Sequence, residues 1–272
     1  MKPNNLPQKK PSLFQTVGVK TSTYKPSPSS ALVPASTSQP IIPRKKKIIV
    51  GLPGSSFSSK FLLSWTQTLF TVWQQGRWDI TVCPGESSFV SFARLKTLGC
   101  DVMRGEHQKP FNDMEYDVFV TIDSDIVFTV EQFVRLIEDT DQHSVVAGSY
   151  LMSDQRHLAV VKDWDHQFFV QHGFFQFLTP SDVEKWREEN RVRFMPCSYI
   201  GMGFFAIRKE ALNALKYPYF HRKLERIELP DGKILTDMSS EDVAFCKNLQ
   251  KAGFTVYLDT ELRVGHEKKI VL

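Results

Sequence analysis

Asp123, Ser124 and Asp125 are the residues whose types and spacing point most directly to chemistry. They interrupt an apolar segment over residues 116–128, YDVFVTIDSDIVF, which is rich in β-branched and aromatic residues. Such a segment predicts a buried central strand, in which two carboxylates are costly unless a ligand binds them. Side chains two apart on an extended chain point the same way, so Asp123 and Asp125 can face one ligand. Carboxylate oxygens at a strand end suit Mg²⁺ or Mn²⁺; the alternative interpretation is an ordinary Asp-Ser-Asp turn.

The elements before this segment are expected to position it. Residues 47–54 predict an apolar strand that breaks into a turn, and Ser55 or Ser56 is expected to cap the next helix. That helix carries an i, i+4 apolar row expected to face the core: Phe57, Phe61, Trp65, Leu69 and Trp73. The sequence therefore begins its folded part with a strand, a loop and an amphipathic helix.

A second unit of the same kind follows. Residues 79–83 predict a strand and residues 89–98 a helix that ends at Gly99, with Arg94 on the polar side of that helix. Repeated strand–loop–helix units predict a largely parallel sheet with right-handed crossovers. Ligands of such open sheets bind beyond the carboxyl ends of the strands, where the Asp-Ser-Asp segment would lie.

Near residue 150 the pattern changes from alternating strands and helices to mixed β structure. Residues 157–161 and 167–178 alternate like antiparallel strands, and 199–207 is an apolar run whose two glycines indicate close backbone approach to a ligand or a strand. A capping box at Thr129 and Gln132 predicts a helix after the Asp-Ser-Asp segment, and further helices are expected to begin at Pro180 and Glu241. The predicted fold class is α/β: one domain with a mixed, mostly parallel central sheet flanked by helices, a nucleotide-binding first half and an acceptor-side second half.

The basic character of the chain is confined to its N-terminal tail. Residues 1–47 carry nine of the 34 Lys and Arg residues and no acid, so the remainder has 25 basic against 30 acidic residues. The tail, 1–46, is rich in proline and serine and is expected to be disordered, with the folded domain at 47–272. The mildly acidic folded part argues against nucleic acid as its partner.

The remaining composition is that of an ordinary soluble protein. The four cysteines, Cys83, Cys100, Cys197 and Cys246, have no metal-site spacing and suit reduced thiols in a cytosol-like compartment. No secretory signal and no apolar stretch of ~20 residues that could span a membrane is visible. We therefore expect a cytoplasmic location and no transmembrane segment.

Taken in order, the motifs resemble those of the GT-A-fold glycosyltransferases that use nucleotide sugars, and most of all the small single-domain enzymes of large DNA viruses. The resemblance covers residues 47–268. It rests on a first strand ending in Leu52-Pro53, on Asp-Ser-Asp, on Gly-Met-Gly-Phe-Phe followed by Arg-Lys-Glu-Ala-Leu, on Ser-Glu-Asp at 240–242 and on Gly265-His266. It implies a GT-A-like fold.

The resemblance also implies a role for each matching residue. Asp123 and Asp125 would hold Mn²⁺ or Mg²⁺, with His266 as a late metal ligand, and Asp242 would be the general base of an inverting reaction. Contacts with the donor nucleotide are implied for the other matching residues, although Leu95 stands where the family has an Asn after the Arg: Pro53, Glu86, Arg94, Asp123, Ser124 and Lys268.

The implied activity is transfer of a sugar from a nucleoside-diphosphate sugar, with a UDP-sugar favoured, to a hydroxyl of a glycan or other acceptor. A divalent metal would neutralise the leaving diphosphate, and a carboxylate could take the acceptor proton. The alternative is a non-catalytic nucleotide-sugar or carbohydrate-binding module of the same fold, against which the Glu241-Asp242 pair argues. Aromatic residues of the second half fit either a sugar platform or a core: Trp164, Phe168, Phe169, Phe174, Phe175 and Tyr199.

Overall fold

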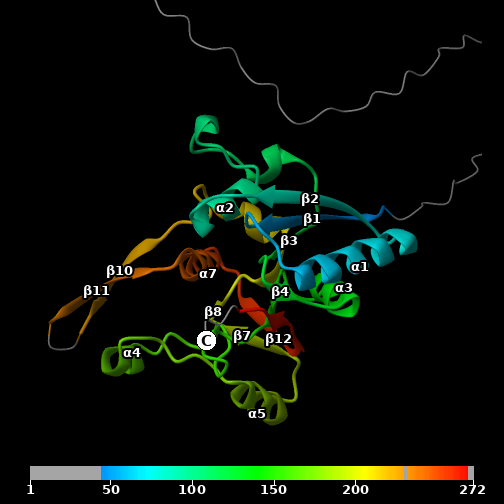
Figure 1. Ribbon diagram of the computed structural model, residues 1–272. Coiled ribbons are helices and arrows are strands. Elements are labelled where there is room, and N and C mark those ends of the chain that lie inside the picture. The colour runs from blue at the N-terminus through cyan, green and yellow to red at the C-terminus, as the bar shows by residue number, and fades with distance from the viewer. Residues whose placement is uncertain (1–43, 230–231, 269–272) are drawn as a thin grey trace, which may run out of the picture. The chain divides into compact units, whose positions relative to one another are not determined.

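A central seven-stranded sheet organises the protein (Figure 1). The computed structural model describes residues 44–229 and 232–268; the expected disordered tail therefore lies, up to residue 43, outside the described residues. The strand order is β2-β1-β3-β9-β5-β12-β7. The strand bounds are β1 (Lys46–Pro53), β2 (Trp78–Gly85), β3 (Val118–Ile122), β5 (Val145–Ser149), β7 (Phe194–Cys197), β9 (Phe204–Arg208) and β12 (Val256–Arg263).

The strand directions confirm a mixed, mostly parallel sheet. β1 runs parallel to β2 and β3, and β5 runs parallel to β12. β9 lies antiparallel between β3 and β5, and β7 is antiparallel to β12 at the edge. Because β9 is antiparallel to both of its neighbours, β5 and β12 run in the same direction as β1 and β3. Only β7 and β9 run in the opposite direction.

Three two-stranded ribbons, seven α-helices and two short 3-10 helices, Val102–Arg104 and Pro110–Asp113, complete the described part of the chain. The ribbons are β4 (Ile126–Val127) with β13 (Gly265–His266), β6 (Val160–Val161) with β8 (Tyr199–Ile200), and β10 (Lys223–Glu228) with β11 (Ile234–Ser239). The helices are α1 (Ser59–Gln75), α2 (Val90–Thr97), α3 (Val130–Asp139), α4 (His166–His172), α5 (Pro180–Asn190), α6 (Lys209–Asn213) and α7 (Glu241–Lys251).

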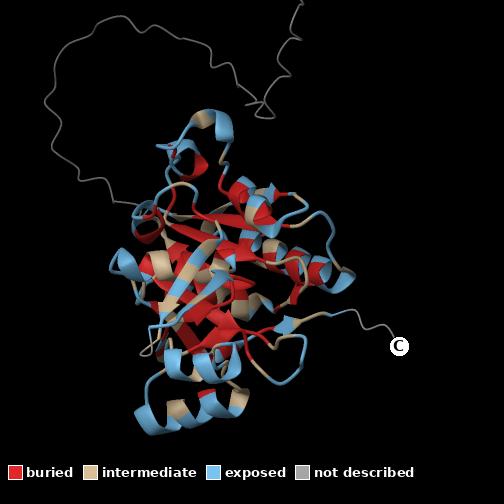
Figure 2. Cartoon of the chain, turned by 90° about the vertical axis from the view of Figure 1, so that its left-hand side faces the viewer, coloured by how far each residue is buried: buried red, intermediate tan, exposed pale blue. Residues whose placement is uncertain are grey.

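The helices cover both faces of the sheet. Alternate residues of β1 and β3 face opposite sides: Ile48 and Val118 pack with α1 and α3, whereas Ile49 and Phe119 pack with α2 and α7. This alternation follows from the two-residue period of a strand, and it gives one apolar layer on each side of the sheet. Figure 2 shows the buried residues concentrated along the sheet. In the part of the chain that is described, no helix is both long and apolar enough to span a membrane.

The apolar row expected on α1 is wrong at both ends. Phe57 precedes the helix, whose N-cap is Ser58, with the Ser58 hydroxyl accepting from the Phe61 amide at 3.0 Å. Trp73, at the other end, is 86% exposed. An i, i+4 row turns by ~40° per step around a helix of ~3.6 residues per turn, so it leaves the buried face. The face that is buried comprises Phe61, Ser64, Trp65, Thr68 and Val72.

The second half departs from expectation at two places. Residues 167–178, expected as a strand, begin as helix α4, which is capped by Asp165 and ends at Gly173. Residues 199–207 are two strands, β8 and β9, separated by a turn rather than one continuous strand. The two glycines of this run do reflect a close approach, to Tyr150: a Cβ on Gly201 would lie 2.2 Å from the Tyr150 hydroxyl.

The expected starts of α3, α5 and α7 are confirmed. Thr129 and Gln132 form a reciprocal capping box before α3, and Thr179 and Asp182 form another before α5. Ser240 occupies the N-cap position of α7. These short-range signals fix where three helices begin, and the last of them places acidic residues in the first turn of α7 beside the sheet.

Candidate active site

The Asp-Ser-Asp turn lies at the carboxyl ends of the parallel strands. Asp123 directly follows β3, and β4 after the turn pairs with β13, so that Ile126 lies opposite His266. The end of β1 packs against the same turn, because a Cβ on Gly54 would lie 3.1 Å from the Ser124 side chain. Segments distant in sequence therefore meet at the edge where open α/β sheets bind ligands.

Asp125 has two nitrogen partners from the C-terminal segment. Its Oδ2 lies 3.2 Å from His266 Nε2 and 2.7 Å from Lys268 Nζ. Burial raises the pKa of Asp125, but hydrogen bonds from His266 and Lys268 outweigh burial and hold this pKa at about 2. Asp125 is therefore ionised at neutral pH, which is the state a metal ligand requires.

The His266 ring is held in one orientation. Its Nδ1 lies 2.6 Å from the carbonyl oxygen of Leu151, and because a carbonyl can only accept, Nδ1 must carry the proton. Nε2 then faces Asp125 Oδ2 with either a proton or a lone pair. A lone pair directed at a carboxylate is unfavourable unless a cation lies between them. Histidine ligands of metals commonly donate their other nitrogen to a carbonyl in this way.

These donors fit a divalent cation only in part. Among the described residues, no three His, Cys, Asp or Glu side chains are gathered closely enough to hold a metal. Asp125 and His266 are two suitable donors, but the expected third, Asp123, accepts a hydrogen bond from Arg94 at 3.0 Å. Mg²⁺ is commonly held by one or two carboxylates together with water and substrate phosphates, so two protein donors are compatible with such a site.

Arg94 is the largest departure from the sequence-based expectation. It was expected on the polar side of α2, but its side chain is 4% exposed and lies between two acids. One guanidinium NH2 donates to Asp123, while Nε lies 3.6 Å from Glu241 Oε1, which is an ion pair beyond hydrogen-bond distance. Weaker bonds of 3.4 Å reach Thr121 Oγ1 and the Met202 carbonyl. Arg94 thus joins the Asp-Ser-Asp turn to the start of α7 from inside the protein.

The charges around Arg94 influence one another strongly. Burial lowers the pKa of Arg94, but the nearby Asp123, Asp242 and Glu241 more than compensate and raise it overall. Burial raises the pKa of Asp123 and that of Glu241, and Arg94 opposes both shifts. Arg94 Nε is buried without a hydrogen-bond partner. The cluster is therefore charged and incompletely bonded, a state that proteins maintain mainly at functional sites.

Asp242 lies in the first turn of α7 and is held by hydroxyl groups. Its Oδ2 accepts from the Tyr199 hydroxyl at 2.8 Å, and its Oδ1 accepts from the Ser240 hydroxyl and from the Val243 amide. Burial and the adjacent Asp242 raise the pKa of Tyr199, so Tyr199 stays a donor. These contacts fix the orientation of a half-buried carboxylate on the far side of Arg94 from the Asp-Ser-Asp turn.

Pro53 and Glu86 mark the ends of the first two strands. Pro53 pairs with Gly85 in the parallel register of β1 and β2, so Glu86 follows at the same edge of the sheet as the Asp-Ser-Asp turn. Glu86 is exposed, and its backbone carbonyl accepts from Lys96 Nζ at 2.6 Å. Pro53 and Glu86, two of the expected nucleotide contacts, thus lie along one edge of the sheet, whereas Arg94 is buried in the protein.

Two residues near this site were not assigned roles from sequence. Glu241 was expected to begin a helix, but no contact was predicted for it, and it is buried against Arg94. Tyr150 is also buried, and its hydroxyl oxygen accepts a hydrogen bond from the Gly203 amide at 3.2 Å. A sequence signal for a further role of Glu241 was its position beside Asp242, since a single acid in the first turn already interacts favourably with the helix dipole.

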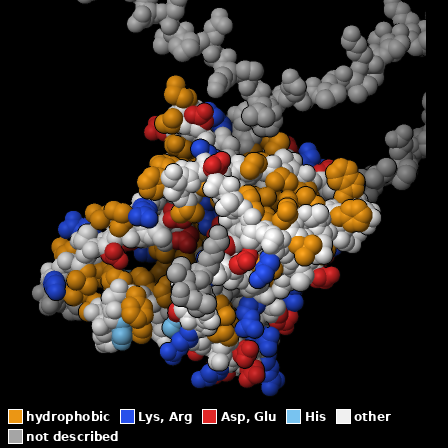
Figure 3. Space-filling view, in the orientation of Figure 1, with side chains coloured by type: hydrophobic (Ala, Val, Ile, Leu, Met, Phe, Trp, Pro, Cys, Tyr) orange, Lys and Arg blue, Asp and Glu red, His pale blue; other side chains and the backbone are white. Residues whose placement is uncertain are grey.

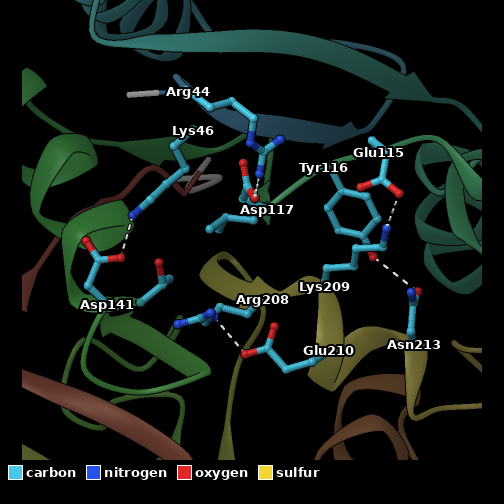
Figure 4. A pocket seen from close by; sticks show the side chains of 12 residues that line it. Arg44, Lys46, Glu115, Tyr116, Asp117, Asp141, Arg208, Lys209, Glu210 and Asn213 are labelled. Carbon is cyan, nitrogen blue, oxygen red and sulfur yellow. Dashed lines mark hydrogen bonds and ion pairs between the residues drawn. The ribbon is translucent and has the colours of Figure 1, made fainter. Parts of the chain in front are cut away.

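A hollow of about 550 Å³ lies at the edge of the sheet opposite the Asp-Ser-Asp turn (Figure 4). It is lined by the starts of β1 and β3 and the end of β9. Its charged side chains are paired with one another: Arg44 with Asp117, Lys46 with Asp141, Lys209 with Glu115 and Arg208 with Glu210. Because these charges neutralise each other and lie at the amino ends of the strands, this hollow is a poorer candidate for a diphosphate.

No protein-family model and no curated protein sequence matches the chain. Solved structures similar to it include the following two. A197 from STIV has a TM-score of 0.41 and 15% identity, over 84% of this chain and 97% of that one. GalNAc-T7, solved with UDP, GalNAc and Mn²⁺, has a TM-score of 0.46 and 11% identity, over 83% of this chain and 43% of that one. At these TM-scores neither similarity assigns an activity, and the function is inferred from the site.

Proposed function

We propose that this protein is a metal-dependent glycosyltransferase of the GT-A type. It transfers a sugar from a nucleoside-diphosphate sugar, with a UDP-sugar favoured, to an acceptor hydroxyl, with inversion. The observation that carries the proposal is the meeting of Asp125 and His266, which are far apart in sequence and lie 3.2 Å apart at the carboxyl edge of the sheet. An ionised carboxylate and an imidazole with its second nitrogen already bonded are both prepared to hold a cation.

The donor end of the site would use residues around the Asp-Ser-Asp turn. Asp125 and His266 hold Mn²⁺ or Mg²⁺, which when bound supplies positive charge to the leaving diphosphate. Lys268, now 2.7 Å from Asp125, is placed to contact the diphosphate as well. Arg94 holds the Asp123 carboxylate through its 3.0 Å hydrogen bond, next to the edge that Pro53 and Glu86 share, where the nucleoside would bind.

The acceptor end would use Asp242. Its carboxylate takes the proton from the attacking hydroxyl, and Tyr199 fixes its orientation through the 2.8 Å hydrogen bond. A hydrogen-bonded carboxylate is a weak base, but the proton of the hydroxyl becomes acidic only as the new bond forms, so a positioned carboxylate is sufficient. Single displacement with one base inverts the anomeric configuration.

Nucleotide binding tests the donor end. Calorimetry of UDP and GDP with the full chain, with and without Mn²⁺, should show Mn²⁺-dependent binding of one nucleotide. The Asp125→Ala variant should lose the Mn²⁺ dependence, while Asp141→Ala, in an exposed ion pair at the opposite edge, should retain it. If folded protein binds neither nucleotide, the proposal is wrong.

Transfer assays test the acceptor end. With a donor that binds, Asp242→Asn should lower kcat by ~10²–10⁴-fold without loss of nucleotide binding, as expected for loss of a general base. Tyr199→Phe keeps the carboxylate and should lower kcat much less. NMR of the product should show inverted anomeric configuration. Binding without any transfer would instead favour a non-catalytic nucleotide-sugar-binding module.

A further inference from the structure

A hollow of about 220 Å³ opens next to Asp242, between α4 with the loop after it and the β10–β11 hairpin. Both segments project from the body on the same side (Figure 1), and Figure 3 shows hydrophobic side chains gathered on them, with a recess between. Tyr199 and Ser240, which both hydrogen-bond to Asp242, form part of its wall. Resting on the proposed function, we infer that this hollow is the acceptor site and that the acceptor group it takes is an uncharged sugar ring.

The first support is the aromatic lining. Trp164, Phe174 and Phe175 line the hollow, and Phe174 is 53% exposed although it is a large apolar side chain. Trp164 and Phe175 are in edge contact, with ring centroids 4.8 Å apart. Aromatic faces that remain open to a hollow suit the C–H face of a sugar ring, which packs on them while its hydroxyls point away.

The second support is a pair of carboxylates in the same wall. Glu225 of β10 lies directly opposite Asp237 of β11 in the antiparallel register, and both line the hollow. Like charges directly opposite each other destabilise a ribbon, so folding alone does not favour this pair. Glu225 Oε2 is paired with Lys247 Nζ at 3.2 Å, but Oε1 is buried with no hydrogen-bond partner. A hydroxyl group of a sugar supplies the donor that Glu225 lacks.

A cationic ligand fits this lining less well. Aromatic rings with carboxylates can form a cage for an ammonium group, but the face of Trp164 already carries Lys247 Nζ, 4.9 Å from the ring centroid. This cation neutralises one of the two carboxylates and repels a second cation. The volume is also below the range of about 300–1,000 Å³ usual for drug-sized ligands, which suits one ring held next to Asp242.

Saturation-transfer NMR with simple glycosides tests the inference. The probes are the methyl glycosides of glucose, galactose, mannose and N-acetylglucosamine, with tetramethylammonium as the cationic comparison, each added to the full chain. At least one glycoside should bind. Trp164→Ala and Glu225→Gln should each weaken that binding by ~10-fold or more, equivalent to ~1.4 kcal/mol. Trp164→Phe should retain most of it, because the ring is kept.

A matched control lies on the same strand. Leu224 is exposed on the opposite side of β10 from Glu225 and lines no part of the hollow, so Leu224→Ala should leave glycoside binding unchanged. Asp125→Ala should also leave it unchanged while removing Mn²⁺-dependent nucleotide binding. If nucleotide binds and no glycoside does, the acceptor inference fails and the proposed donor site stands. If a glycoside binds and no nucleotide does, the hollow is a sugar site and the proposed transfer fails. Preferential binding of tetramethylammonium would overturn the inference.

Discussion

Two ionic clusters of similar composition serve different purposes in this protein. The first, here called the site cluster, contains Arg94, Asp123, Asp125, Glu241, His266 and Lys268. The second, here called the scaffold cluster, joins α3 to β12 and to the segment before β7 and contains Arg135, Asp139, Arg193 and Asp259. Both combine acids with arginine, yet the central charged group of each cluster is bonded differently.

In the scaffold cluster, the central carboxylate is saturated. Asp259 is fully buried and accepts from Arg135 and Arg193 through both of its oxygens, with four bonds of 2.7–3.2 Å. In the site cluster, Arg94 Nε has no hydrogen-bond partner, and Asp125 receives His266 and Lys268 on a single oxygen. Complete bonding of a central charge such as Asp259 stabilises a fold, whereas an incompletely bonded central charge such as Arg94 leaves capacity for a ligand. The scaffold cluster is not saturated throughout, because Asp139 Oδ2 is also buried without a hydrogen-bond partner. The predictions below test this difference.

Replacing Arg94 should have the largest effect on stability. Arg94→Met leaves Asp123 and Glu241 in the interior without their cation, and removal of one partner from a buried ion pair costs ~3–5 kcal/mol. The free energy of unfolding from urea titration should fall by about this amount. Arg94→Lys, which restores the charge without the planar guanidinium, should recover part of it. A loss below ~1 kcal/mol for Arg94→Met would show that the site cluster does not depend on this cation.

Breaking the scaffold cluster should cost slightly less. Asp259→Asn removes the charge that holds Arg135 and Arg193, but both arginine side chains are about one-third exposed and can be hydrated again. We expect a loss of ~3 kcal/mol, at the lower end of the range for buried pairs. Mn²⁺-dependent nucleotide binding by the folded variant should be unchanged. Weakened binding at a temperature where the variant is folded would contradict the separation of the two clusters.

The scaffold cluster should also make stability depend on pH. Burial and the charge of Asp259 raise the pKa of Asp139 to about 7, whereas an unfolded aspartate titrates near ~3.9. Between these values the folded chain binds more protons, so stability should decrease as the pH rises from about 5 to 7. The slope should stay below ~1.4 kcal/mol per pH unit, the value for one whole proton. Thermal unfolding across this range should show the decrease, and Asp139→Asn should flatten it.

The smallest change in stability is expected at Asp125. Its side chain is 37% exposed and its ion pairs are partly screened by solvent, so Asp125→Asn should cost less than ~1 kcal/mol. The same substitution should abolish Mn²⁺-dependent nucleotide binding, because the ligand charge is lost. Asp125→Asn should therefore lose nucleotide binding and keep its stability, whereas Asp259→Asn should lose stability and keep nucleotide binding. Asp125→Asn protein that is strongly destabilised would place Asp125 with the scaffold instead.

Local sequence signals predicted the sheet and the starts of α3, α5 and α7, whereas α1 is capped by Ser58 and not by the expected Ser55 or Ser56. The Asp-Ser-Asp turn could be predicted because charged residues interrupt an apolar strand. This interruption spans only a few residues, so the local sequence is enough to detect it. The capping box at Thr129 and the helix start after Thr179 were predicted for the same reason, since cap and helix are adjacent. The segment of helix α4 resembles a strand because its alternating aromatic residues also suit a strand, but the Asp165 cap and the Gly173 stop favour the helix.

The position of Arg94 could not be read from sequence. The charge of an arginine predicts exposure, and only tertiary contacts with Asp123 and Glu241 reverse this. The approach of His266 to Asp125 likewise depends on the pairing of β13 with β4, across most of the chain. Sequence could suggest that these residues act together only through the resemblance to glycosyltransferases. Contacts between distant segments are the part of the site that a structure adds.

The place of β12 in the sheet has a consequence for how the protein folds. β12 inserts between β5 and β7, and its Tyr257 pairs with Val146, more than a hundred residues earlier. The β1–β3 region can pair early during synthesis, but β5 keeps one edge unpaired until β12 has been made. Pairing across such sequence distances is slow, and an unpaired strand edge promotes association with other chains. Nascent chains halted before residue 256 should therefore be the species most prone to aggregate.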